Sequence, residues 1–377
     1  MTDIPALLID TLRLGASPSA DRAVRWHEII DPAVESLVRS EGAASWLYSR
    51  WRDAATNQVR LLPHGSGIRA TAMAEVGMTL RVEEAAVEAL AVLSSAGFEA
   101  VLLKGLAYRA AAGEVPYLDS RSTMDVDLLV SPSDAEPAWQ ALRRAGFVPT
   151  PPPDAPKPAE HHHLDGLWSD RRIPVELHTS TSSSCAPNEA WQRMRGGAVN
   201  RRWNGMNVLV PSATEMLWHA VEHSFTHDAA GFTLRQFLPG AALMAAGAPI
   251  DVELIQHRVA MNQLREGNEG RFATSDALTR WLEMAGALAT PISVPAVWRD
   301  GYGHLWRLLS WRLMLLRQLG PESRLHPYLR EQGTRAEARL AMLPTSATWS
   351  VRYRAQYLIL AVLSRLAYGV LKARRAG

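Results

Sequence analysis

The stretch that decides the fold reads Leu102-Leu103-Lys104-Gly105, then Thr123-Met124-Asp125-Val126-Asp127-Leu128-Leu129-Val130, and then Val175-Glu176-Leu177-His178. Each piece sets charged side chains within or at the end of a short run of β-forming residues. The runs predict strands over residues 99–103, 123–130 and 173–179, with a short helix over 106–112 after the first. Because long helical stretches flank these strands, the sequence predicts an α+β fold.

Three carboxylates belong to this stretch. Side chains alternate between the two faces of a strand, so Asp125 and Asp127 point the same way and Val126 points the other way. Glu176 shares a face with His178 in the same manner. Two neighbouring carboxylates repel each other unless a cation or a basic partner lies between them. The pattern indicates either a Mg²⁺ site for phosphoryl or nucleotidyl transfer or a half-exposed strand with solvated acids.

The turn in front of the carboxylates favours the first interpretation. Lys104 and Gly105 end one strand and open a helix. Backbone amides at the start of a helix, together with an ammonium group, can approach phosphates closely. The turn therefore indicates a phosphate-bearing ligand beside the metal site.

These segments, with Arg121 shortly before the Asp pair, resemble the DNA polymerase β-type nucleotidyltransferase superfamily. The resemblance covers residues 80 to 180 and is closest to a bacterial branch of uncharacterised nucleotidyltransferases with a Leu-Lys-Gly turn. It implies an enzyme that moves a nucleoside monophosphate from a nucleoside triphosphate, ATP by preference, to an acceptor oxygen and releases pyrophosphate. Relatives in this branch are associated with the maturation of peptide natural products, so a peptide or a small molecule is the implied acceptor.

The resemblance also implies roles for particular residues. Asp125 and Asp127 would hold two Mg²⁺ ions, which Mn²⁺ could replace. Glu176 would complete the site of the ion that activates the acceptor, so these three carboxylates are the implied catalytic residues. Whether Glu176 also takes the acceptor's proton stays open.

The same resemblance implies the residues that bind the nucleotide. Gly105 would contact the triphosphate through its backbone, and Arg121 matches the branch. The superfamily usually has Gly-Ser where this chain has Lys104-Gly105, so a serine hydroxyl is missing. We therefore assign Lys104 to the β- and γ-phosphates as its substitute.

Histidines near the third strand are further candidates. His178 shares the face of Glu176 and could orient it, contact the substrate or play a structural part. In the run His161-His162-His163, alternate members share one face. His163 could thus line the cleft, or the run could form a polar strand edge.

A second group of histidines, His219, His223 and His227, recurs with the spacing of one helical face. The His-Glu-x-x-His pattern of zinc proteases is absent. The spacing favours a helix that lines the acceptor pocket or packs on the core, with Glu222 and Arg235 as further pocket candidates by analogy.

The expected organisation has three parts. Residues 1–80 form an N-terminal helical segment, in which a long helix begins near residue 68 and runs to 95. Residues 81–180 form a small mixed β-sheet core that carries the nucleotidyltransferase residues. Residues 181–377 form a larger C-terminal helical domain, which helps to build the acceptor pocket and ends in a basic tail.

Composition narrows the class of protein further. The single Cys185 excludes an intramolecular disulfide and a cysteine-based zinc site, and no signal peptide or membrane span is apparent, so we expect a cytoplasmic protein. Residues 301–377 hold twelve Arg and one Lys against three Glu, although the whole chain carries only +2. Such a tail could consist of core-facing helices with solvated Arg, contact a membrane peripherally or, less favoured, bind nucleic acid.

Two other functions remain open. A protein of this fold could bind a nucleotide as a sensor without catalysis, although the presence of all three carboxylates argues against it. It could also add nucleotides to an RNA end by using the basic tail, in which case its RNA affinity would depend steeply on salt.

Overall fold

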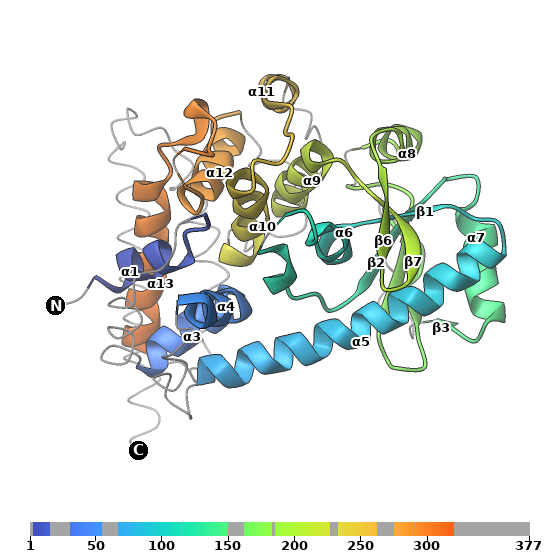
Figure 1. Ribbon diagram of the computed structural model, residues 1–377, viewed down its shortest axis with the longest axis horizontal. Coiled ribbons are helices and arrows are strands. Elements are labelled where there is room, and N and C mark those ends of the chain that lie inside the picture. Colours follow the sequence, from blue (N-terminus) through green and yellow to red (C-terminus); the bar gives the residue numbers. More distant parts are fainter. Residues whose placement is uncertain are drawn as a thin grey trace, which may run out of the picture.

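The computed structural model describes residues 3–15, 31–54, 67–115, 117–149, 162–182, 185–226, 233–261, 275–290 and 292–319. Within these ranges the protein is α+β, as the sequence predicts, with one mixed sheet surrounded by helices (Figure 1). The described strands are β1 (Ala100–Leu102), β2 (Val126–Val130), β3 (Val148–Pro149), β4 (Leu167–Trp168), β5 (Pro174–His178), β6 (Val199–Trp203) and β7 (Met206–Val210). Their order in the sheet is β3-β4-β5-β2-β1-β7-β6.

The described helices are α1 (Ile4–Leu12), α3 (Pro32–Ser40), α4 (Ala44–Ala54), α5 (Gly67–Ser95), α6 (Lys104–Ala111), α7 (Ala135–Arg144), α8 (Pro187–Gly196), α9 (Ala213–Thr226), α10 (Leu234–Ala245), α11 (Val252–Ala260), α12 (Ser275–Ala287) and α13 (Tyr302–Leu319). The long α5 confirms the helix predicted to run from residue 68 to 95. It runs from α3 and α4 to the sheet, where it contacts β2 and β5 (Figure 1).

The pairing of the central strands positions the charged residues. β2 and β5 run parallel, and their register sets Asp127 opposite Glu176 and Leu129 opposite His178. β1 runs antiparallel to β2, and the amide of Leu103 donates to the carbonyl of Asp127 over 3.0 Å. The end of β1, where Lys104 follows, therefore lies beside the carboxylates.

The sheet extends further along the chain than the sequence indicated. β6 and β7 form a hairpin, and β7 pairs with β1 in parallel, so residues 199–210 belong to the sheet although they fall in the range assigned to the C-terminal helical domain. β6 is an edge strand with mostly exposed side chains, several of them polar. It therefore lacks the alternation of apolar and polar residues by which a strand is predicted from sequence. Its turn, Asn204-Gly205, with φ of 45° and 81°, is the sequence signal that identifies such a hairpin. The division into three parts stays a proposal.

Helix α13 shows what the first part of the basic tail does. It packs against α1, α3 and α12, and it buries Leu305, Leu309 and Leu313. Arg312 is also buried and forms an ion pair with Glu41. This part of the tail therefore consists of a core-facing helix, while residues 353–375 lie outside the described ranges. No helix in the described part of the chain combines the length and the apolar character needed to cross a membrane.

Candidate active site

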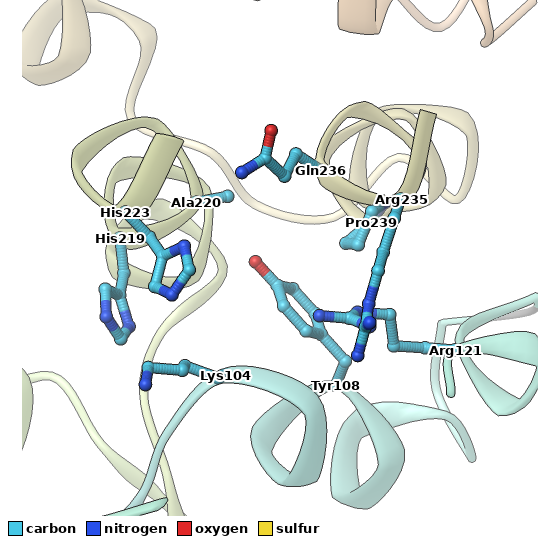
Figure 2. Close-up of a pocket in the computed structure, with 9 residues that line it drawn as sticks. All are labelled: Lys104, Tyr108, Arg121, His219, Ala220, His223, Arg235, Gln236 and Pro239. Carbon is cyan, nitrogen blue, oxygen red and sulfur yellow. The ribbon is translucent and has the colours of Figure 1, made fainter. Parts of the chain in front are cut away.

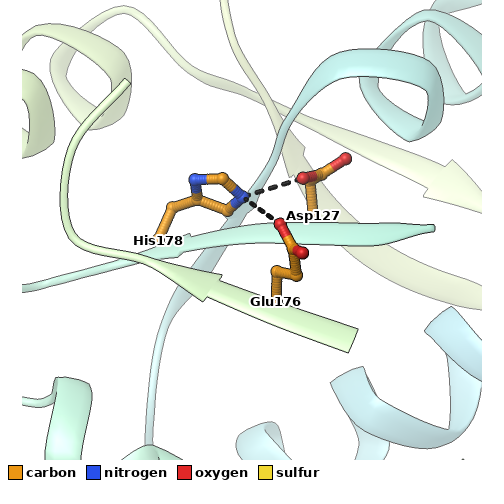
Figure 3. A group of neighbouring side chains, drawn as sticks. All are labelled: Asp127, Glu176 and His178. Atoms are coloured by element: carbon orange, nitrogen blue, oxygen red, sulfur yellow. Dashed lines mark hydrogen bonds and ion pairs between the residues drawn. The ribbon is translucent and has the colours of Figure 1, made fainter. Parts of the chain in front are cut away.

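The carboxylate of Asp127 is the centre of the site. It is 1% exposed, and its Oδ1 accepts hydrogen bonds from Lys104 Nζ at 2.6 Å and His178 Nε2 at 2.8 Å. The same imidazole nitrogen lies 3.5 Å from Glu176 Oε2, so His178 bridges the two carboxylates (Figure 3). The side chains converge because alternate residues of two parallel, in-register strands share one face of the sheet.

The charges at this centre stabilise one another. Burial opposes the charge of Asp127, but Lys104 and His178 outweigh it and hold the pKa of Asp127 well below its ordinary value. The hydrogen bond from His178 likewise lowers the pKa of Glu176. For Lys104, the effect of burial is overcome by Asp127 and then Asp125, and its pKa is raised. At neutral pH the ammonium and both carboxylates are therefore charged.

Asp125 lies one residue before β2 and is half-buried. Burial first, and then the charge of Asp127, raise its pKa to about 6. Its carboxylate is not part of the possible metal-binding group of Asp127, Glu176 and His178. The charges of Lys104 and Arg235 are nevertheless close enough to lower its pKa in part. Asp125 is thus the carboxylate of this site that takes up a proton most readily.

The residues fit a divalent metal ion. One ligand atom each from Asp127, Glu176 and His178 lies within 4.8 Å of the others. The second oxygen of Asp127, Oδ2, is buried and finds no hydrogen-bond donor among the described residues. A buried carboxylate oxygen without a donor is costly, and a cation would satisfy it.

The turn after β1 directs Lys104 toward the carboxylates. Lys104 adopts a left-handed backbone conformation with φ of 45°, which is unusual for a residue with a side chain. Gly105, which follows it, leaves no room for a Cβ atom, because such an atom would lie 2.4 Å from Thr123 Oγ1. The helix α6 thus begins at a tightly packed turn whose shape is set by its neighbours.

Lys104, which contacts the acidic cluster, also lines a pocket between α6, α9 and α10 (Figure 2). Nine residues line it in the described part of the chain, and none of them is acidic. Its lining is Lys104, Tyr108, Arg121, His219, Ala220, His223, Arg235, Gln236 and Pro239. The prevalence of basic side chains indicates an anionic ligand.

Two side chains of the pocket, Arg121 and His219, have buried nitrogen atoms without a hydrogen-bond partner among the described residues. Burial and the neighbouring Arg235 lower the pKa of Arg121 to about 9, and the Nε of Arg121 finds no acceptor among the described residues. Burial first, and then the charge of Lys104, hold the pKa of His219 well below its ordinary value. His219 is therefore neutral at pH 7, and its buried Nε2 has no hydrogen-bond partner in the described ranges. An anion that accepts hydrogen bonds would satisfy these groups.

The structure thus brings together most of the residues singled out in the sequence. Lys104, Asp127, Glu176 and His178 are in contact, and Arg121 and Arg235 line the adjoining pocket. His163 pairs with His178 in an isolated bridge, with ring centroids 5.4 Å apart. His161 and His227 lie outside the described residues.

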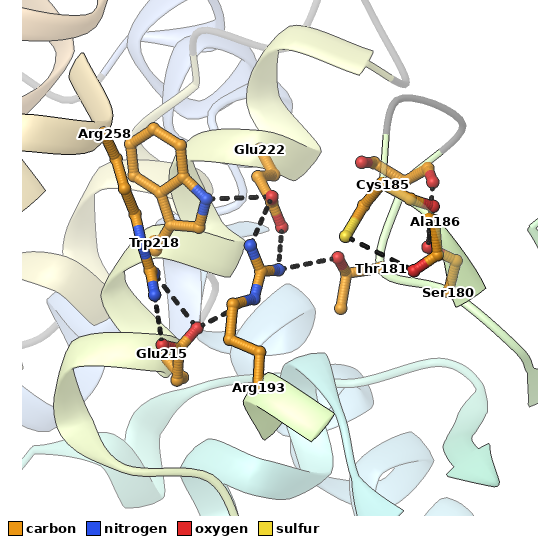
Figure 4. Close-up of polar contacts among 10 residues, drawn as sticks. Ser180, Thr181, Cys185, Ala186, Arg193, Glu215, Trp218, Glu222 and Arg258 are labelled. Atoms are coloured by element: carbon orange, nitrogen blue, oxygen red, sulfur yellow. Dashed lines mark hydrogen bonds and ion pairs between the residues drawn. The ribbon is translucent and has the colours of Figure 1, made fainter. Parts of the chain in front are cut away.

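Some residues of the site went unnoticed in the sequence. Tyr108 lines the pocket because it follows Lys104 by four residues, and that spacing alone places both on one face of α6. Glu222, an expected pocket residue, does not line the pocket. It belongs instead to a buried network on another side of α9 (Figure 4).

That network joins α9 to its neighbours. Arg193 on α8 holds both oxygens of Glu222, at 3.1 and 2.9 Å, and lies 3.1 Å from Glu215. Glu215 is also held by both terminal nitrogens of Arg258 on α11, at 3.1 and 2.6 Å. The indole of Trp218 donates to Glu222. The same helix carries His219 and His223 on the side that faces the pocket. By anchoring α9, the network therefore also holds these two histidines in position.

An acidic cluster that could hold a metal ion, on the inner strands β2 and β5 and beside a basic pocket, suits an enzyme that acts on phosphate-bearing substrates. The family model described as an uncharacterised nucleotidyltransferase matches residues 22–269, about two thirds of the chain. The chain belongs to this family and is a nucleotidyltransferase, a transferase that takes a nucleoside triphosphate as substrate. No curated protein and no solved structure matches the chain.

Proposed function

We propose that the protein transfers a nucleoside monophosphate from a nucleoside triphosphate, ATP by preference, to an acceptor oxygen on a small molecule or peptide. The acceptor oxygen forms a bond to the α-phosphorus, and the bond from that phosphorus to the bridging oxygen breaks. Pyrophosphate leaves with the electron pair of that bond. The acceptor's proton passes to a carboxylate of the cluster. Glu176 suits this role because it is half-exposed and because its lowered pKa keeps it ionised.

The observation that carries this proposal is the position of Lys104. Its ammonium contacts Asp127 in the acidic cluster, and its side chain also lines the basic pocket. A triphosphate whose β- and γ-phosphates lie in the pocket, near Lys104, Arg121 and Arg235, would present its α-phosphorus toward the carboxylates. Positioning and charge neutralisation of this kind supply most of the barrier reduction in phosphoryl-type transfer.

Asp127 and Glu176 would hold a divalent metal ion, with Asp125 beside them. When bound, such an ion supplies the positive charge that makes the acceptor oxygen a stronger nucleophile. Carboxylate ligands favour Mg²⁺, and Mn²⁺ accepts the same ligands together with an imidazole. His178, which contacts both carboxylates, would keep them oriented.

The experiment incubates the protein and Mg²⁺ with each nucleoside triphosphate, labelled at the α-phosphate, and with an extract of the host cell. We expect the label in a new product that resists ribonuclease, and we expect its loss in Asp127→Asn. Arg171→Met removes an exposed cation that belongs neither to the pocket nor to the acidic cluster, so this variant should keep the activity.

Other outcomes would point elsewhere. Label in a ribonuclease-sensitive product would identify an RNA-end nucleotidyltransferase. Tight nucleotide binding without any labelled product would identify a sensor. If no nucleoside triphosphate binds in the presence of Mg²⁺, the proposal is wrong.

A further inference from the structure

We propose that Lys104 takes the place of one of the two metal ions used by two-metal nucleotidyl transfer, so that this protein works with a single divalent ion. The inference rests on the proposed function, because it assigns the positive charges of that same site. Two-metal sites place ions roughly 3.5–4 Å apart, and a shared carboxylate contacts both of them. Here a lysine ammonium already contacts the carboxylate that would be shared.

The first support is the contact itself. Lys104 Nζ lies 2.6 Å from Asp127 Oδ1, and the Lys104 side chain is 18% exposed. The packing of Gly105 against Thr123 fixes the turn that aims the side chain inward. The ammonium is therefore a built-in part of the cluster and not a surface group that happens to lie near it.

The second support is the number of oxygens left for metal ions. Asp127 Oδ1 already accepts from Lys104 and from His178, so only Oδ2 lacks a donor among the described residues. The group able to ligate an ion comprises Asp127, Glu176 and His178, and Asp125 stays outside it. A second ion would need both aspartates as shared ligands. Among the described residues, the protein therefore offers one group of three ligands for an ion.

The third support is the positive charge already present in the cluster. Two basic side chains, Lys104 and His178, contact the carboxylate of Asp127. A second divalent ion would add two more positive charges beside them and beside the basic pocket.

The fourth support is that the pocket supplies what the replaced ion would supply. In a two-metal site, the ion nearer the leaving group neutralises the charge that develops on pyrophosphate. Arg121 and Arg235 line the pocket on that side of the carboxylates, and no acidic residue is among the described residues that line it. These two fixed cations can stabilise the leaving group without a second ion.

The test counts Mn²⁺ ions bound to the full chain, by equilibrium dialysis with electron paramagnetic resonance, alone and with α,β-methylene-ATP. We expect one ion per wild-type chain under both conditions, with the hyperfine pattern of an isolated ion. Lys104→Met, which keeps the length of the side chain without its charge, should bind two ions with an exchange-broadened spectrum. Lys104→Arg should restore the count of one, and Arg171→Met should behave as wild type.

A second ion in the wild-type protein, whether exchange-coupled or not, would overturn the inference, and so would a count of one in Lys104→Met. Should Lys104→Met fail to fold, as judged by circular dichroism, the wild-type count still decides the question. If the nucleotide analogue failed to bind, the proposed function would be wrong. The role of Lys104 would still be tested, because the number of Mn²⁺ ions bound without nucleotide does not depend on the analogue.

Discussion

The buried network on α9 yields a prediction that can be worked out from its contacts. Replacing Arg193 by Met removes the guanidinium that holds both oxygens of Glu222, while Glu215 keeps its two contacts with Arg258. Glu222 is 3% exposed and would retain the neutral indole N–H of Trp218. The variant therefore takes this guanidinium away from a buried carboxylate.

Removing one partner of a buried ion pair costs about 3–5 kcal/mol, because the remaining charge stays out of water. We expect the free energy of unfolding to fall by about 3 kcal/mol in Arg193→Met, at the low end because Glu215 keeps its partner. Adding Glu222→Gln removes the charge that the Arg193 guanidinium faces. The double variant should therefore be less destabilised than Arg193→Met, with a loss of about 1–2 kcal/mol for the remaining hydrogen bonds, including that to Thr181.

Urea denaturation followed by tryptophan fluorescence measures these differences. Arg195 offers a matched control, because it lies on the same helix and also forms a two-armed pair, with Glu99, but that pair is largely exposed. Arg195→Met should cost at most ~1 kcal/mol. If Arg193→Met loses no more stability than Arg195→Met, or if Glu222→Gln fails to rescue it, the network does not carry the energy assigned to it.

Three further changes test the site. Gly105→Ala would set a Cβ 2.4 Å from Thr123 Oγ1, so we expect a loss of about 1–3 kcal/mol in urea denaturation. Arg235→Met removes a charged donor worth about 1.5–3 kcal/mol. The apparent KM for the nucleotide should rise roughly 10- to 150-fold with kcat little changed, and an unchanged KM would exclude Arg235 from nucleotide binding. Because the pKa of Asp125 is about 6, its charge appears as the pH rises through that value, so Mn²⁺ affinity measured by calorimetry should increase about tenfold from pH 5 to pH 7. In Asp125→Asn this increase should be smaller, since only the deprotonation of His178, whose pKa, despite burial, is raised by its contacts with Asp127 and Glu176, would then contribute.

Local patterns predicted the carboxylate face well. The alternation of side chains along a strand needs only neighbouring residues, so Asp127 could be assigned to a polar face from sequence alone. The contact between Asp127 and Glu176 depends on pairing between strands some fifty residues apart, and only the family resemblance implied it. The position of Lys104 at the turn was predicted as well. Its hydrogen bond to Asp127 was not, because that bond depends on the left-handed backbone of the turn.

The pocket could not be assembled from local patterns. Its lining comes from α6, α9, α10 and the segment before β2, and their meeting depends on tertiary packing. Arg235, for example, is held there by residues near the N-terminus, because its amide donates to the carbonyl of Glu41 over 2.8 Å. A carboxylate oxygen of Glu41 also accepts from the amide of Leu234. Contacts between residues almost two hundred positions apart leave no periodic trace in the sequence.

The two sides of α9 show how the fold can keep so many like charges together. On one side, the carboxylates of Glu215 and Glu222 are matched by Arg193 and Arg258, so this part of the helix is anchored by balanced charge. On the pocket side, His219 is kept neutral by burial and by Lys104, so it adds no further repulsion to the basic lining. The unbalanced positive charge is thereby confined to the pocket, where an anionic substrate would neutralise it. The network's contacts do not involve the residues that line the pocket, so they anchor α9 without neutralising the positive charge there.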